Sequence, residues 1–220
     1  MSEPILHGFD GSTYVRTVRI VLNRKGVAHE QNPVDVLAGE TRGAAHLERH
    51  PFGTVPVLDI DGIRIRETDA ILRYLEATRD GPAAIPESAR DRARMDEALS
   101  MIHAHGYDAL VGVAFYHLKP DFIGSPTEEA HRRTLDTARR FMAHMGEIRG
   151  GDPWLAGAQP SLADYCLGPL IFYVGLTPHL DEVLAAGDLS DWWERTKRDE
   201  AFAATEPDLD RTPPDQPTMR

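Results

Sequence analysis

Cysteine is almost absent from this sequence, in which Cys166 is the only one among 220 residues. A disulfide within the chain is therefore impossible, and so are a Cys-x-x-Cys redox pair and a multi-cysteine zinc site. Long hydrophobic runs are also missing, because no stretch approaches the roughly 20 apolar residues that span a bilayer. The opening MSEPILHGFDGS has no basic segment before an apolar one and does not resemble a secretory signal. We therefore expect a cytoplasmic protein.

Basic residues are scarce relative to acidic ones. The formal net charge is -11, from 24 Lys and Arg against 35 Asp and Glu. Binding to nucleic acid requires a basic face that neutralises phosphate groups, and an anionic membrane surface attracts basic segments. We therefore expect neither a nucleic acid nor a membrane as a partner.

The first third of the chain alternates between strand and helix patterns. The Asp61-Gly62 pair lies between two short apolar-polar alternations, which is a strong hairpin signal. Gly26 ends a stretch whose apolar residues recur near helical spacing. The expected elements are strands at 4–9, 27–34, 57–60 and 63–66, and helices at 14–26 and 67–79.

The pattern becomes helical throughout after a Gly/Pro-rich stretch, with long helices expected at 87–118 and 127–149. Ser161 and Asp164 are spaced as a capping box at the start of an apolar helix. The last 15 residues contain four prolines and few apolar side chains, which is typical of a loose tail. We predict an α/β domain at 1–79, a linker at 80–86, an all-helical domain at 87–205 and a flexible tail at 206–220.

One short segment, HPFGTVPVL at 50–58, raises a specific question. Pro56 stands where a strand should begin, yet proline donates no backbone hydrogen bond. The residues alone leave two interpretations open. Pro56 either begins a strand or holds a turn in a fixed shape.

Longer stretches carry a family resemblance. HPFGTVPVLDIDGIRIRETDAILRYLE is similar to the Asn-Pro-x-Gly-x-Val-Pro-x-Leu and Glu-Ser-x-Ala-Ile segments of the cytosolic glutathione S-transferase superfamily, and PSLADYCLG resembles its Ser/Thr-x-x-Asp box. The order and spacing of these segments cover residues 4–200. The resemblance implies a thioredoxin-like domain followed by an all-α domain, a homodimer, glutathione as cosubstrate, and no metal.

The same resemblance implies where glutathione binds. The family holds the Val-Pro peptide bond in the cis form, which for Val55-Pro56 leaves the Val55 backbone groups to a peptide that lies there like an added strand. Glu67 and Thr68 would hold the ammonium and carboxylate of the γ-glutamyl end at a helix N-terminus. Plain helix capping is the alternative for this pair.

Two further residues are expected at the glycine end of the tripeptide, namely Arg42 and His50. His50 stands where the family usually has Asn, and Thr54 where some classes have Gln. These departures leave open that His50 is only a surface histidine.

The loop DGSTYVR supplies the candidates for activating the thiol. STYVRTVRIVLNRKG resembles the zeta-class stretch Ser-Ser-Cys-Ser-Trp-Arg-Val-Arg-Ile-Ala-Leu-x-x-Lys-Gly, a register that places Ser12 at the catalytic serine. Other classes use a residue two positions later, where this chain has Tyr14, and Thr13 also carries a hydroxyl. Ser12 is the expected catalytic residue, and Tyr14 and then Thr13 are the alternatives; Ser12 also suits a purely structural role as a helix N-cap.

The helical half is expected to meet the second substrate. Tyr107 and Phe115 would line its pocket, with core packing as the alternative. His103 and His105 are spaced i, i+2, which is poor spacing for two metal ligands on one helix face, so no metal is expected.

The expected function is attack of the glutathione thiolate on a small, hydrophobic electrophile, as in detoxification. One alternative is a glutathione-dependent cis-trans isomerase of the maleylacetoacetate or maleylpyruvate type. Another is a non-catalytic binding or scaffold protein that keeps the fold.

Overall fold

The computed structural model describes residues 3–209 and divides into two compact units. The first unit runs to Gly81 and also takes in residues 204–209, and the second runs from Pro82 to Ala203. The division after Gly81 falls inside the predicted linker, 80–86. At the other end the prediction differs, because the described residues 204–209 belong to the first unit and not to a helical domain or a detached tail. The rest of the predicted tail, 210–220, lies outside the described residues.

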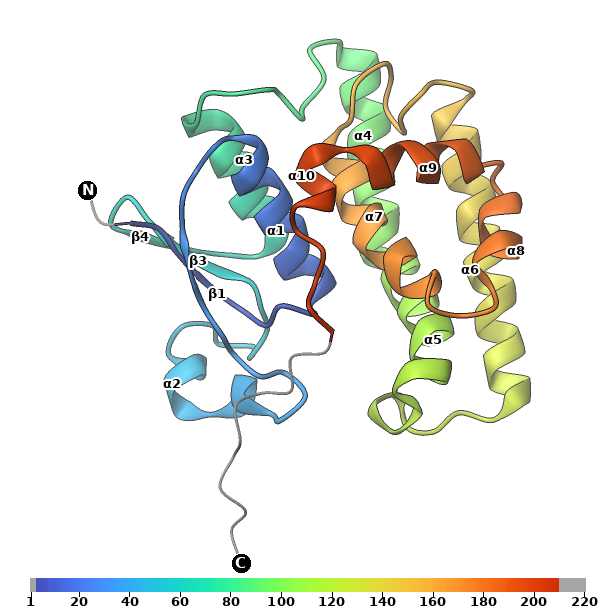
Figure 1. Ribbon diagram of the computed structural model, residues 1–220, viewed down its shortest axis with the longest axis horizontal. Helices are drawn as coiled ribbons and strands as arrows, with labels where there is room; N and C mark the ends of the chain where they lie inside the picture. The colour runs from blue at the N-terminus through green and yellow to red at the C-terminus, as the bar shows by residue number, and fades with distance from the viewer. Residues whose placement is uncertain (1–2, 210–220) are drawn as a thin grey trace, which may run out of the picture. The chain divides into compact units, whose positions relative to one another are not determined.

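The first unit is built on a four-stranded mixed sheet in the order β2-β1-β3-β4 (Figure 1). The pair β1 and β2 is parallel, and the other two pairs are antiparallel. The hairpin turn at Asp61-Gly62 has positive φ at both residues, 52° and 78°, as a two-residue turn of the primed type requires. The strands are β1 (Ile5–His7), β2 (Glu30–Asn32), β3 (Val57–Ile60) and β4 (Ile63–Arg66).

Two helices pack against each other in this unit, α1 (Thr13–Arg24) and α3 (Thr68–Thr78) (Figure 1). The branched aliphatic side chains of both helices are fully buried, as the helical spacing of the sequence predicts. The link between β2 and β3 contains a 3-10 turn η1 (Glu40–Arg42) and the short helix α2 (Ala44–Leu47). The buried apolar side chains of the two packed helices and the strands include Leu6, Val15, Val18, Leu22, Leu58, Ile71, Leu72 and Leu75.

The second unit is entirely helical, and in Figure 1 its longest helix, α6, runs beside α5. The predicted helix at 87–118 is interrupted by a π-helical turn, η2. Gly106 ends this turn, and a Cβ there would lie 2.4 Å from the ring of Phe141 on α6, so the ring packs directly on the backbone. The elements are α4 (Ala89–Met101), η2 (Ile102–Gly106), α5 (Tyr107–Leu118), η3 (Pro120–Ile123), α6 (Glu128–Arg149), α7 (Leu162–Val174), α8 (Leu180–Ala185), α9 (Ser190–Arg198) and α10 (Glu200–Ala203).

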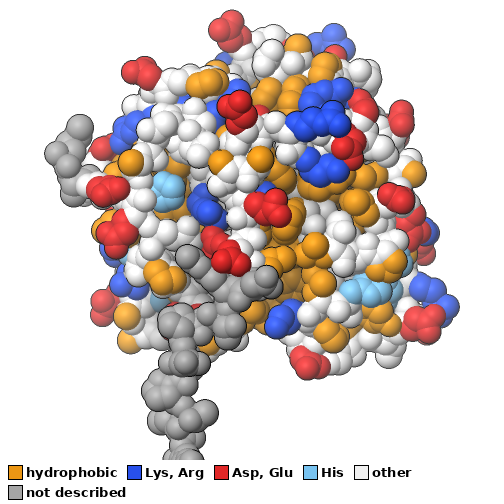
Figure 2. Space-filling view, in the orientation of Figure 1, with side chains coloured by type: hydrophobic (Ala, Val, Ile, Leu, Met, Phe, Trp, Pro, Cys, Tyr) orange, Lys and Arg blue, Asp and Glu red, His pale blue; other side chains and the backbone are white. Residues whose placement is uncertain are grey.

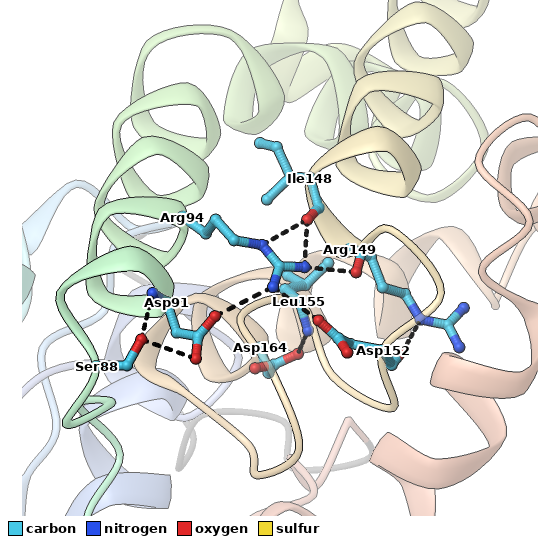
Figure 3. A network of polar contacts seen from close by, with 8 residues as sticks. All are labelled: Ser88, Asp91, Arg94, Ile148, Arg149, Asp152, Leu155 and Asp164. Carbon is cyan, nitrogen blue, oxygen red and sulfur yellow. Dashed lines mark hydrogen bonds and ion pairs between the residues drawn. The ribbon is translucent and has the colours of Figure 1, made fainter.

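Arg94 fastens α4 to the end of α6, as Figure 3 shows. Its guanidinium donates to the carbonyl oxygens of Ile148, at 2.9 and 2.6 Å, and Arg149, at 2.5 Å. The last carbonyls of a helix have no partner within the helix, and a basic side chain is well suited to bind them. The same guanidinium also contacts Asp91 and Asp152, at 3.2 and 2.7 Å.

Asp164 is the buried centre of the helical unit, with no exposed surface. Its carboxylate accepts hydrogen bonds from the backbone N–H of Leu155 at 2.9 Å (Figure 3), from Trp192 Nε1 at 2.8 Å, and from both N–H and Oγ of Ser161 at 2.7 Å. The predicted capping box of Ser161 and Asp164 is present. Cys166 lies on the same helix and is also buried.

Within residues 3–209, no helix combines the length and apolar character needed to cross a membrane.

Candidate glutathione-binding site

The register of the sheet brings three separate segments to one edge. His7 at the end of β1 pairs with Val57 at the start of β3, and Val57 also pairs with Arg66 at the end of β4. The loop that follows β1, the turn that precedes β3 and the start of α3 after β4 must therefore lie at the same edge. These segments contain Ser12, Val55-Pro56 and Glu67-Thr68, which the sequence analysis selected.

Ser12 is the N-cap of α1 and is half-buried. Its Oγ accepts the backbone N–H of Val15 at 3.4 Å. A hydroxyl has two lone pairs and one proton, so this contact leaves the proton of Ser12 available to a ligand. The N–H groups of the first helical turn point in the same direction as the cap, and together they favour an anion.

The loop that carries Ser12 is anchored on both sides. Asp10 pairs with Arg19 on α1, and its other carboxylate oxygen accepts the backbone N–H of Asp208 at 3.0 Å. The latter contact comes from the returning segment 204–209, which the sequence analysis did not connect to this loop. Asp10 is thus a residue that the pattern alone did not identify.

The alternative hydroxyls differ in accessibility. Thr13 is 9% exposed, so its side chain is largely withdrawn from a ligand. Tyr14 is half-buried in the first turn of α1. Burial therefore disfavours Thr13 and leaves Ser12 and Tyr14 as the candidates.

The Val55–Pro56 peptide bond is cis, as the resemblance implies. Strand pairing on both sides of β3 begins only at Val57, so Val55 lies outside the ladder. The proline therefore holds a turn ahead of the strand, which settles the question that HPFGTVPVL raised. The half-buried Val55 lies ahead of the start of β3, with its backbone outside the sheet.

Two buried histidines hold this turn. His50 is 2% exposed, so the interpretation as a surface histidine is wrong. Its Nδ1 accepts the N–H of Phe52 at 3.3 Å, which in neutral imidazole leaves the proton on Nε2, 3.0 Å from Thr54 Oγ1. His46 on α2 donates from Nε2 to the carbonyl oxygen of Thr54 at 2.9 Å, a role that no motif signals.

His50 also reaches the start of α3. Its Nε2 lies 3.4 Å from Glu67 Oε1. Burial lowers the pKa of His50, and the nearby Glu67 carboxylate partly offsets this effect. A neutral His50 leaves the negative charge of Glu67 available for another partner.

Glu67 has an unusual backbone and an unusual exposure. Its φ is 69° and its ψ 128°, a region that side chains other than glycine rarely adopt and that costs on the order of 1–3 kcal/mol. Its side chain is 71% exposed. Within the part of the chain that the structure describes, no side chain caps α3, so plain capping does not explain Glu67. Thr68, the first helical residue, is buried at 8% exposure.

The remaining predicted residues have other contacts. Arg42 is exposed and donates from Nη1 to the carbonyl oxygen of Phe52 at 3.3 Å, which ties it to the same turn. In the helical unit, Tyr107 begins α5, and burial raises the pKa of its hydroxyl. Phe115 packs edge-on against Phe122 and Tyr173, with ring centroids 5.6 and 6.4 Å away. Packing thus accounts for Phe115, and its role toward a substrate stays a prediction.

Comparisons with known proteins agree with this architecture. Residues 6–83 match the family model of the glutathione S-transferase N-terminal domain, and residues 128–202 match that of the C-terminal domain. A maleylacetoacetate isomerase of Rhizobium meliloti is 35% identical over 182 residues, covering 78% of this chain and 81% of the relative. A glutathione S-transferase of Arabidopsis thaliana is 27% identical, over 80% and 83% of the two chains.

A solved structure of glutathione S-transferase III in its apo form superposes with a TM-score of 0.81 at 26% identity. The superposition covers 97% of this chain and 100% of that structure's chain. The thioredoxin-like sheet unit followed by an all-helical unit is thus the architecture of these relatives. The chain belongs to the cytosolic glutathione S-transferase superfamily.

Proposed function

We propose that this protein is a glutathione transferase that activates the thiol of glutathione for attack on a small, hydrophobic electrophile. The observation that carries the proposal is the sheet edge at which Ser12, the Val55 backbone and the exposed Glu67 at an uncapped helix meet. A tripeptide with one ammonium, two carboxylates and one thiol has a matching group for each of these features. Arg42 and the turn that His50 and Thr54 form would face its glycine end.

The reaction follows from the position of Ser12 at the start of α1. A thiol has a pKa near 8.5, so only a small fraction is ionised at neutral pH. The Ser12 hydroxyl donates to the sulfur, and the helix N-terminus stabilises its negative charge. The thiolate forms a carbon–sulfur bond with the electrophile, the leaving group departs with the bonding electrons, and the thiol proton passes to solvent.

Glu67 supplies a sharp test of the binding mode. Glu67→Gln is expected to weaken glutathione binding about 10-fold or more, because a hydrogen bond between charged groups contributes roughly 1.5–3 kcal/mol. A glutathione analogue that lacks the α-ammonium should bind wild type and Glu67→Gln equally in calorimetric titrations. Glu48→Gln, an exposed glutamate of the same unit, should change neither affinity. Equal losses for both ligands would mean that Glu67 acts on the fold and not on the ammonium.

A second function is favoured by the isomerase from Rhizobium meliloti, the relative with 35% identity. In an isomerase the thiolate adds to a conjugated double bond, the bond rotates, and glutathione leaves unchanged. Product analysis separates the two reactions. With a nitro-substituted aryl chloride we expect one thioether for each glutathione consumed, whereas turnover of a cis-enone with no glutathione consumed would establish the isomerase.

The alternative of a non-catalytic binding or scaffold protein makes a different prediction, which is that the pKa of the glutathione thiol does not shift when glutathione is added to the protein. The exposed Glu67 at a strained backbone position counts against this alternative, since a scaffold gains nothing from that strain.

We further propose that the protein works in the cytoplasm as a homodimer, in the detoxification of electrophiles, as is usual for this superfamily.

A further inference from the structure

Three histidines from different parts of the helical unit lie together, although they are spread along the sequence between residues 117 and 179. His117 is in the last turn of α5, His131 is in the first turn of α6, and His179 directly precedes α8. One ring nitrogen of each lies within 4.8 Å of those of the other two. Figure 2 shows histidine side chains, in pale blue, at the surface over this unit. From this cluster we infer a binding site for a divalent transition metal of the zinc type.

The spacing of the rings is the spacing that one metal ion imposes. The three ring centroids are 5.1, 5.1 and 5.2 Å apart. With Zn–N bonds of about 2.0–2.1 Å in tetrahedral directions, imidazole centroids should be about 5 Å apart and ligand nitrogens about 3.3 Å. His131 Nε2 and His179 Nε2 are 3.2 Å apart. His117, the third member of the cluster, is exposed.

The proton of His179 is placed so that a lone pair on Nε2 is left for a metal. His179 Nδ1 contacts the carboxylate of Glu182, which can only accept, so the proton lies on Nδ1 and the lone pair on Nε2. Glu182 is in turn paired with Arg139. A carboxylate behind a ligating histidine is the usual way in which proteins orient such a ligand and raise its basicity.

His131 is held just as firmly. It is 6% exposed and stacks on Tyr116, with ring centroids 3.8 Å apart and an interplanar angle of 11°. Without an ion, its Nε2 donates to His179 Nε2 at 3.2 Å, and its Nδ1 is buried without a hydrogen-bond partner among the described residues. An ion between the two Nε2 atoms would replace this hydrogen bond and shift the His131 proton to Nδ1.

The site has three protein ligands and an accessible fourth position. His117 is exposed and His179 is half-buried, so water can occupy that position. The bound ion ties the end of α5 to α6 and to the segment before α8. The expectation of no metal came from the family resemblance and from the poor spacing of His103 and His105, which are not members of this cluster.

The test uses the untagged, full-length protein, stripped with a chelator and titrated with ZnCl2 in a calorimeter. We expect one zinc ion per chain and an increase of the thermal unfolding temperature with zinc. His179→Gln should weaken binding by at least about 100-fold, and Glu182→Gln, which alters only the supporting carboxylate, by about 10-fold. Visible spectra of the Co2+-loaded protein should show four-coordinate geometry in wild type and in His144→Gln, and not in His179→Gln.

His144→Gln is the matched control, since His144 lies on α6 about 20 Å from His131 and contacts Glu147 and Glu97 instead. It should leave the affinity for zinc unchanged. If His179→Gln is unstable, the exposed His117→Ala provides the same loss without disturbing the interior. Absence of zinc binding in wild type, or equal binding by wild type and both ligand variants, would overturn the site.

Discussion

Replacing Ser12 by alanine is expected to lower kcat/KM by about 100-fold, the effect of removing one donor from a developing or bound anion. The hydroxyl of Ser12 accepts the N–H of Val15 through a lone pair, so its proton can donate to the sulfur. The variant loses this hydrogen bond to the sulfur. The pH at which the rate reaches half its maximum should rise by about two units, which corresponds to roughly 2.7 kcal/mol. Steady-state kinetics across pH measure both effects.

Ser12 also caps α1, so its structural role must be separated from its chemical role. Ser12→Gly is the control, because glycine is a tolerated N-cap that costs only a few tenths of a kcal/mol, whereas alanine costs about 1 kcal/mol. Equal activity losses in the two variants with unequal unfolding free energies would assign the loss to the hydroxyl. A loss in Tyr14→Phe but not in Ser12→Gly would transfer the catalytic role to Tyr14.

Asp164→Ala is expected to reduce the free energy of unfolding by roughly 3–5 kcal/mol. The substitution leaves the N–H groups of Leu155, Ser161 and Trp192 buried without their acceptor, and each unsatisfied buried donor costs about 1–3 kcal/mol. Such a loss is a large part of the roughly 5–15 kcal/mol that stabilises a typical domain. Urea unfolding followed by tryptophan fluorescence measures it.

Two further variants keep this prediction testable if Asp164→Ala does not fold. Asp164→Asn keeps the shape and one acceptor oxygen and should retain part of the stability. Asp108→Ala removes an exposed aspartate of the same unit and should change the free energy by no more than about 0.5 kcal/mol. Equal effects of Asp164→Ala and Asp108→Ala would contradict a structural role for the buried carboxylate.

Local patterns accounted for much of the fold. The hairpin around Asp61-Gly62 was predicted with its observed bounds, because both the alternation and the turn residues are local signals. The helix predicted at 87–118 instead contains η2, because its interruption depends on how Phe141 from α6 packs on Gly106. The short α8 was not predicted, since six residues are too few to display a helical period.

The candidate site was predictable only in part, for a similar reason. The family motifs identified Val55-Pro56 and Glu67, whose cis bond and exposed, strained position the structure describes. The burial of His50 and the support from His46 depend on how the link after β2 folds over the turn, which no period encodes. The three-histidine cluster likewise arises only when separate helices meet.

The most direct test of the proposed function is an ultraviolet difference titration of the glutathione thiolate bound to the wild-type protein. The account predicts a saturable thiolate signal whose pKa lies about two units below the ordinary thiol value near 8.5, and a return toward that value in Ser12→Gly. Saturable binding of glutathione with a thiol pKa near 8.5 in the wild-type protein would contradict it.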